Sequence, residues 1–164
     1  MRAYVGLGSN LAHPRRQLAR AAAALRRIPR TRLVALSPSY VTAPVGVADA
    51  QPDYVNAVAL LHTELEPRAL LARLNAIERR QKRKRVKRNA ARTLDLDLLL
   101  FGRRRLHVPR LSLPHPRMHA RAFVLRPLID VAPAITIPGH GLARQRMREV
   151  KDQRIVRTRT DHHR

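Results

Sequence analysis

The segment Arg92–Gly102 limits the choice of fold more than any other part of this sequence. Its residues alternate between polar and apolar as far as Asp97 and are then apolar up to a glycine, a pattern that predicts a mostly buried β-strand. Successive side chains of a strand point to opposite faces, so Asp95 and Asp97 are expected on one face with Cα atoms about 6.5–7 Å apart. The leucines that alternate with them are expected in the core: Leu94, Leu96 and Leu98.

Two neighbouring carboxylates on a leucine-rich strand are costly unless a cation neutralises them. Oxygen ligands suit Mg²⁺, which takes one or two protein carboxylates and completes its octahedron with phosphate and water oxygens. The strand therefore indicates a site for one or two Mg²⁺ ions at Asp95 and Asp97. The alternative is a solvated strand face that carries two aspartates, and the strand alone does not decide between them.

Length and composition indicate one domain. The chain has 164 residues, of which 45% are hydrophobic, and this is enough to form a core. We expect a single domain at 1–158 and a disordered basic tail at 159–164. Cysteine is absent, which fits a reducing compartment. The first residues resemble neither a signal peptide nor a membrane span, so we expect a cytoplasmic protein without membrane attachment.

The charge of the chain favours anionic partners. Lys and Arg number 34 against 11 acidic residues, a net charge of +23, and such a field attracts nucleotides and nucleic acids. Eight of the ten residues Arg79–Arg88 are basic, and we expect a mobile loop there unless an anion orders it. A basic loop directly before the aspartate strand suits a metal–nucleotide site, although a generic polyanion-binding or targeting tract has the same composition.

The hydrophobic pattern predicts, in chain order, a strand at 4–7, a helix at 14–28, a strand at 31–40 with an edge or bulge at Pro38, a strand at 54–61, a helix from Pro67 and the strand at 92–101. It further predicts a hairpin at 103–108, a short helix around 121–125 that stops at Pro127, a helix at 142–150 and a strand at 154–157. Strands adjacent in sequence usually lie adjacent in space. The order therefore predicts a ferredoxin-like α+β fold, a mainly antiparallel sheet with helices packed on it.

Two residues of the predicted strand at 54–61 are suited to a flat ligand. Tyr54 and Asn56 share one strand face at a loop-to-strand junction, where the ring would stack on the ligand and the amide would read its hydrogen-bonding edge. The more frequent interpretation is a cross-strand aromatic and a turn asparagine.

Four segments together resemble the 6-hydroxymethyl-7,8-dihydropterin pyrophosphokinase family of folate biosynthesis, over Ala3 to about Pro138. They are Gly8–Leu11, Gln51–Ala57, Arg92–Asp97 and Leu113–Met118, the last followed by Arg121 and Phe123. The resemblance implies transfer of the β,γ-pyrophosphate of Mg-ATP to the 6-hydroxymethyl oxygen of the pterin, with AMP as the second product.

The resemblance also implies roles for individual residues. The catalytic set is Arg83, Arg92, Asp95 and Asp97, and the two aspartates would hold two Mg²⁺ ions. The ATP-binding set is Asn75, Glu78, Arg83, Arg85, Arg92, Arg110, Ser112, His115 and Arg121. The pterin-binding set is Thr42, Ala43, Pro44, Val45, Tyr54, Asn56 and Phe123. Tyr54 and Phe123 would enclose the pterin ring.

A basic nucleic-acid-binding protein on the same scaffold is the main alternative, supported by the charge and by the tract at 79–88. It leaves Asp95 and Asp97 unexplained, because carboxylates repel phosphate without a metal. A metal-dependent nuclease is a third hypothesis, but it would need more carboxylates than this site offers. We expect a monomer that binds polyanions non-specifically at low salt.

Overall fold

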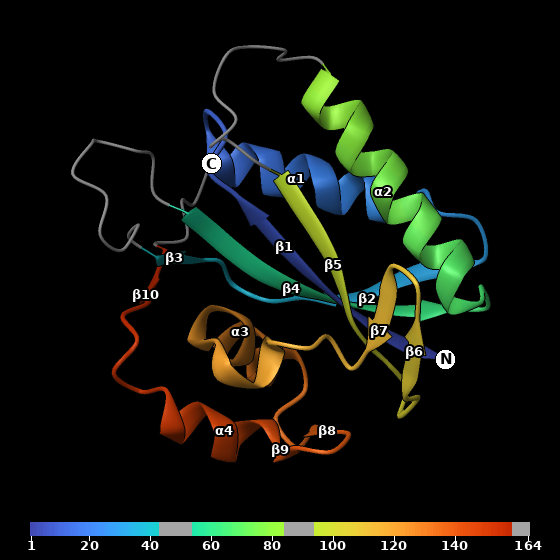
Figure 1. The fold of residues 1–164 in the computed structure, drawn as a ribbon. Helices are drawn as coiled ribbons and strands as arrows, with labels where there is room; N and C mark the ends of the chain where they lie inside the picture. Colours follow the sequence, from blue (N-terminus) through green and yellow to red (C-terminus); the bar gives the residue numbers. More distant parts are fainter. Residues whose placement is uncertain (43–53, 84–93, 159–164) are drawn as a thin grey trace.

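The computed structural model describes residues 1–42, 54–83 and 94–158, except for the side chains of Lys82 and Arg83 (Figure 1). Its main sheet is antiparallel throughout. β1 (Arg2–Ser9) lies between β4 (Tyr54–Thr63) and β5 (Leu94–Phe101). The far side of β4 pairs with β2 (Thr31–Leu36) and β3 (Tyr40–Thr42), and β10 (Val156–Arg157) closes the edge beyond β3.

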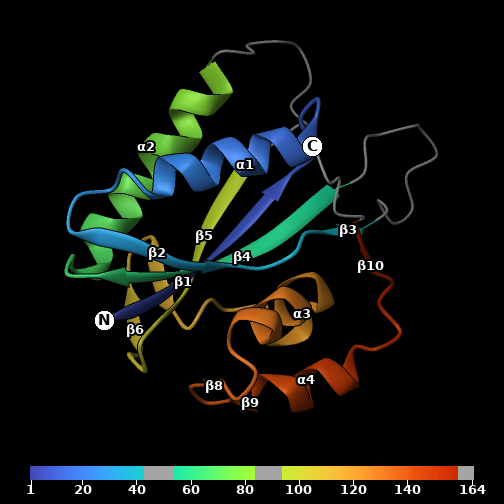
Figure 2. The same cartoon turned by 180° about the vertical axis from the view of Figure 1, so that it is seen from behind.

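Helices cover both faces of this sheet, as Figures 1 and 2 show from opposite sides. α1 (Pro14–Leu25) and α2 (Pro67–Arg83) lie on one face, which we call the α1/α2 face. α3 (Ala122–Val131) and α4 (Ala143–Glu149) lie on the other, the α3 face. This arrangement is the predicted ferredoxin-like α+β fold. In the described residues, no helix is long and apolar enough to span a membrane.

The strand alternation divides the core into two apolar clusters. Val5, Leu7 and Leu96 pack with the leucines of α1 and α2, whereas Tyr4 and Leu99 pack with those of α3. The alternation continues into polar positions, so Gly8, Asn56, Asp95 and Asp97 belong to the α3 face. The prediction that the leucines beside the aspartates face the core is confirmed, because Leu94 is 0% exposed and Leu96 1%.

Two predicted boundaries near the N-terminus differ from the structure. α1 ends at Leu25 instead of residue 28, because the next residues tighten into a turn in which Arg27 and Ile28 donate to carbonyls three residues back, at 3.0 and 3.3 Å. The predicted strand at 31–40 divides into β2 and β3 around Pro38. There the Ser37 hydroxyl accepts the backbone N–H of Val58 at 2.9 Å, so the interruption leaves this N–H of β4 paired.

The prediction of a loop from Arg79 is wrong for residues 79–83, which form the last turn of α2. Buried Gln81 donates from Nε2 to the carbonyl oxygen and to Oε1 of Gln17 in α1, at 2.7 and 2.9 Å. These hydrogen bonds hold the basic end of α2 against α1 despite the repulsion among its charges. Residues 84–88 of the predicted loop lie outside the described part of the chain.

The short helix predicted to stop at Pro127 continues through it to Val131. Pro127 has no N–H to donate to the carbonyl four residues back, but Leu125 and Leu128 on either side are fully buried at 0% exposure. The burial of these two side chains offsets the missing hydrogen bond.

The remaining short elements are β6 (Leu106–Val108), β7 (Leu111–Leu113), the 3₁₀ turn η1 (Met118–Ala120), β8 (Thr136–Ile137) and β9 (Gly141–Leu142). β6 pairs with β7, so the hairpin lies at 106–113 rather than at 103–108. The predictions of a helix at 142–150 and of a terminal strand are confirmed by α4 and β10.

A matched pair of leucines tests the assignment of the core. Leu61→Ala removes a side chain that is 0% exposed and should destabilise the fold by about 2–5 kcal/mol. Leu36→Ala is the control, because Leu36 is 43% exposed, and it should cost less than about 1 kcal/mol. Urea unfolding followed by circular dichroism measures both, and equal losses would contradict the assignment.

Candidate active site

Three neighbouring strands bring a row of polar side chains together on the α3 face. Gly8 of β1 pairs with Asn56 of β4 on one side and with Asp95 of β5 on the other. A Cβ atom at Gly8 would lie 2.9 Å from Oδ1 of Asn56 and 3.7 Å from Cε1 of Tyr54. Glycine at this position therefore lets the Asn56 amide lie closer to β1 than a residue with a side chain would allow.

Tyr54 and Asn56 are linked to other predicted site residues by hydrogen bonds. The Tyr54 hydroxyl donates to Oδ2 of Asp95 at 3.4 Å, and Nδ2 of Asn56 donates to the Thr42 hydroxyl at 3.3 Å. The predicted pterin-binding residues of β4 and the predicted metal-binding residue of β5 thus share one surface. Asn56 is 7% exposed, so its amide is largely shielded from solvent.

Asp97 lies two residues beyond Asp95 on the same strand face; it is exposed at the surface, whereas Asp95 is partly buried. Burial by the surrounding protein raises the pKa of its carboxyl above the usual value. The charge of Asp95 raises it further, whereas His115 and Arg121 act in the opposite direction. The structure therefore groups four predicted site residues around this position: Asp95, Asp97, His115 and Arg121.

The chain after β7 fixes the position of His115. Its backbone N–H donates to the carbonyl of Leu99 at 2.9 Å, and its Nδ1 accepts the backbone N–H of Arg117 at 3.4 Å. Burial lowers the pKa of the His115 ring, Asp97 raises it, and Arg121 and Arg117 lower it. The Arg121 guanidinium carbon lies 5.5 Å from the centre of the Phe123 ring, which places this aromatic beside the basic side of the site.

The raised pKa of Asp97 has a consequence for stability. Because the folded protein disfavours its ionised form, Asp97→Asn should raise the melting temperature at pH 7 in the absence of metal. The gain should shrink as the pH falls through the raised pKa, and it should vanish below about pH 3, where aspartate is protonated in both states. Calorimetry in EDTA across this range measures the effect. Exposed Asp152→Asn is the control, and a lower melting temperature for Asp97→Asn at pH 7 would contradict the argument.

Other predicted nucleotide-binding residues surround this site less closely. Glu78 of α2 accepts the backbone N–H of Leu96 at 3.2 Å and so ties the end of α2 to β5. Asn75 lies one turn earlier on α2 and is exposed. Arg110 and Ser112 belong to the β6–β7 hairpin, and no hydrogen bond or ion pair within the described residues joins them to the aspartates.

Several predicted residues lie outside the described part of the chain: Ala43, Pro44, Val45, Arg85 and Arg92. For Arg83, the structure describes the backbone at the end of α2. Gly8 belongs to one of the motifs that resemble the family, but its close contact with the Asn56 amide was not predicted. A signal for it was the pair of glycines, Gly6 within and Gly8 directly after the strand predicted at 4–7, because glycine in a strand often marks a close approach of a ligand or another chain.

The carboxylates of Asp95 and Asp97 suit a magnesium ion that a substrate also binds. The two carboxylates supply hard oxygen ligands, and one of them has a pKa raised by burial and by its neighbour. Among the described residues there is no cluster of three or more His, Cys, Asp or Glu side chains able to hold a metal. An ion bound here would complete its coordination with phosphate and water oxygens, as Mg²⁺ commonly does.

Comparison with known proteins identifies the class of this fold and site. The model of the family described as 7,8-dihydro-6-hydroxymethylpterin-pyrophosphokinase matches residues 4–133. Two curated relatives are named 2-amino-4-hydroxy-6-hydroxymethyldihydropteridine pyrophosphokinase. The one from Pseudomonas aeruginosa is 56% identical over 137 residues, covering 84% of each chain. The one from Haemophilus influenzae is 42% identical over 155 residues, covering 94% of this chain and 96% of the relative.

Solved structures support the same fold. The crystal structure of Plasmodium falciparum HPPK-DHPS A437G with STZ-DHP superposes with a TM-score of 0.68 at 14% identity. It covers 90% of this chain, and this chain spans 45% of that longer one. The chain belongs to the 7,8-dihydro-6-hydroxymethylpterin-pyrophosphokinase family. This confirms the family inferred from the sequence, and with it a pyrophosphokinase of folate biosynthesis, and it lends no support to the nucleic-acid-binding alternative.

Proposed function

We propose that this chain transfers the β,γ-pyrophosphate of Mg-ATP to the 6-hydroxymethyl group of 6-hydroxymethyl-7,8-dihydropterin, giving AMP and the pterin pyrophosphate. The observation that carries the proposal is the row of Asn56, Gly8 and Asp95 across three strands. It puts a residue suited to reading a flat heterocycle beside a carboxylate suited to a metal–phosphate group. Such a reaction needs both groups held in line, which a shared surface favours.

Asp95 and Asp97 would hold two Mg²⁺ ions together with oxygens of the triphosphate. When bound, these ions supply charge neutralisation on the triphosphate and a lower pKa for the attacking hydroxyl. The protein's part is to present two carboxylates on one rigid strand and to keep Tyr54 hydrogen-bonded to one of them. A hydroxyl whose pKa is lowered in this way would need no separate general base.

The basic residues would bind the phosphates. Arg83 and Arg92 would clamp them and stabilise the charge that develops during transfer, with Arg85 assisting, since guanidinium groups bind phosphate through two parallel hydrogen bonds. These three assignments rest on the family resemblance. Arg121 and His115 have further support, because both act on the Asp97 carboxyl in the structure. Asn75, Glu78, Arg110 and Ser112 would contribute to the surrounding nucleotide site.

The pterin would lie between the rings of Tyr54 and Phe123. Asn56 would pair with its hydrogen-bonding edge, with help from Thr42 and from the backbone of residues 43–45. Selectivity follows because a ligand that lacks the matching edge leaves a buried amide without a partner. The burial of Asn56, at 7% exposure, supports this role.

The reaction is tested by measuring AMP formed from Mg-ATP, with and without 6-hydroxymethyl-7,8-dihydropterin, at a salt concentration that suppresses non-specific polyanion binding. We expect AMP to appear only when the pterin is present. Folded protein that releases no AMP with both substrates would contradict the proposal, and so would AMP release that is independent of the pterin.

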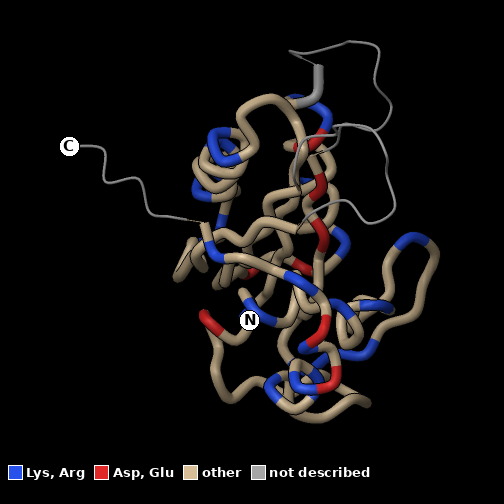
Figure 3. Tube along the Cα trace, turned by 90° about the vertical axis from the view of Figure 1, so that its left-hand side faces the viewer, with Lys and Arg blue, Asp and Glu red and all other residues tan. Residues whose placement is uncertain are grey.

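We further propose a cytoplasmic monomer with one domain at 1–158. Use of ATP and the absence of cysteine support the location. Basic residues are spread over the described chain rather than confined to one element (Figure 3), so weak binding of polyanions at low salt should accompany the enzymatic activity.

A further inference from the structure

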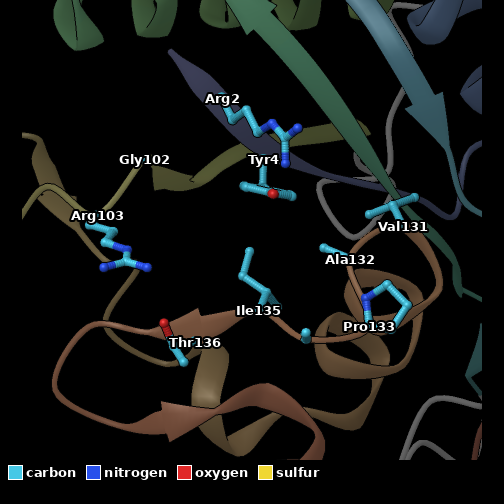
Figure 4. A pocket seen from close by; sticks show the side chains of 10 residues that line it. Arg2, Tyr4, Gly102, Arg103, Val131, Ala132, Pro133, Ile135 and Thr136 are labelled. Carbon is cyan, nitrogen blue, oxygen red and sulfur yellow. The ribbon is translucent and has the colours of Figure 1, made fainter.

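A cavity of about 550 Å³ lies at the opposite end of β1 from Gly8. Figure 4 shows Tyr4 near its centre, with Arg2 above, Arg103 on the side of β5 and the segment after α3 across from them. The volume falls within the range of about 300–1,000 Å³ typical of small-molecule sites. Gly8 is four positions along β1 from Tyr4, which corresponds to about 13 Å, so this cavity is distinct from the candidate active site.

The positive charge at this cavity is not neutralised by the described protein. In residues 1–42, 54–83 and 94–158, neither the Arg2 nor the Arg103 guanidinium takes part in an ion pair or hydrogen bond. Neighbouring Arg104, by contrast, pairs with Glu66 at 3.1 Å. Guanidinium groups are strong donors to phosphate and carboxylate oxygens, so the two free groups favour an anion.

The backbone places these two arginines at the wall of the cavity that β1 and the turn after β5 form. The amide of Gly102 donates to the carbonyl of Arg2 at 2.7 Å, which fastens the turn after β5 to the start of β1. Gly102 has a φ of +55°, a conformation that other residues adopt at a cost. Arg103 follows directly, so both arginines flank the cavity because of backbone contacts and not because of a partner for their side chains.

The rest of the wall is largely apolar. Tyr4, which is 5% exposed, forms the floor. Val131, Ala132, Pro133 and Ile135 form the side opposite the strands. Burial of an apolar ligand group against this surface is favourable. A bare inorganic ion has no apolar group to bury here.

We propose that this cavity binds a small organic anion, an apolar ring or short chain that carries one phosphate or carboxylate group. The anionic group would lie by Arg2, with Arg103 adding to the positive potential, and the apolar part against Tyr4 and Ile135. The net charge of +23 favours such a ligand and disfavours a second copy of this chain.

Nuclear magnetic resonance with ¹⁵N-labelled full-length protein tests the proposal, using phenyl phosphate and benzoate as anionic probes and benzyl alcohol as the neutral one. We expect saturable shifts of the amides of Gly102, Arg103 and Thr136 with at least one anion, and about 10-fold weaker binding of benzyl alcohol. The stronger of the two anions identifies the preferred charged group. Shifts confined to the amides around Gly8 and Asp95, or equal binding of the neutral probe, would overturn the proposal.

Two variants separate the charge from the shape of the cavity. Arg2→Gln should weaken binding of the anion about 10-fold, whereas Arg104→Gln, the adjacent arginine with an acidic partner, should leave it unchanged. Ala134→Trp should block the cavity without changing the charge. Unchanged binding in both Arg2→Gln and Ala134→Trp, with wild-type melting temperatures, would overturn the proposal. Neither position belongs to the catalytic site, so the rate of AMP formation should remain that of the wild type.

Discussion

Asp95→Asn is expected to lower kcat for AMP formation at least about 1000-fold, equivalent to about 4 kcal/mol of transition-state stabilisation. The substitution keeps the shape of the side chain and an oxygen for the Tyr54 hydroxyl, which lies 3.4 Å from Asp95. It removes the negative charge that would hold the metal–triphosphate group. Geometry is thereby retained while the electrostatic contribution is lost.

Steady-state assays at several Mg²⁺ concentrations measure this effect. Asp152→Asn is the control, since Asp152 is an exposed aspartate in the turn after α4, and its kcat should match that of the wild type. The loss in Asp95→Asn should persist at saturating ATP and Mg²⁺. A kcat within 10-fold of the wild type, in a folded variant, would exclude Asp95 from the reaction.

Gly8→Ala should reduce kcat/KM for the pterin about 100-fold, mostly through KM. The added Cβ atom would lie 2.9 Å from Oδ1 of Asn56, so either the amide or the strand has to move. A displaced Asn56 also loses its alignment with Thr42, which accepts its Nδ2 at 3.3 Å. Mispairing of a buried amide with its ligand typically costs about 1–3 kcal/mol.

Gly6→Ala provides a matched control on the same strand and the same face. There the new Cβ would meet Cδ1 of Leu99 at 3.4 Å, a contact that a leucine side chain relieves by a small shift. Both variants should unfold cooperatively, and Gly6→Ala should keep near-normal KM for the pterin. Equal losses in the two variants would mean that the effect comes from the strand and not from the space beside Asn56.

Much of this architecture follows from local sequence patterns. The alternation around Asp95 and Asp97 correctly placed the leucines in the core and the aspartates on the opposite face, because a strand with one buried face fixes its own register. The order of strands and helices was enough to predict the ferredoxin-like fold, but not the pairing of β1, which lies between β4 and β5 although neither follows it directly in the sequence.

The errors arose where distant residues override a local signal. Pro127 is a helix-breaking residue, yet α3 continues past it because Leu125 and Leu128 are buried on either side. The charges near Arg79 favoured a loop, but Gln81 reaches a partner 64 residues away, Gln17, and extends α2. Likewise, the predicted strand at 4–7 ended before Gly8, whereas β1 continues to Ser9 and pairs Gly8 with Asn56 and Asp95.

The pairing of β10 with β3 matters for handling this protein. β10 covers the outer edge of the sheet, and the backbone N–H of Thr158 donates to the carbonyl of Ser39 at 2.9 Å. Without this strand, β3 would present unpaired N–H and C=O groups, which are templates for aggregation. Truncation before Val156, or proteolysis that removes β10 during storage, would therefore promote aggregation of the purified protein while its hydrophobic core is still intact.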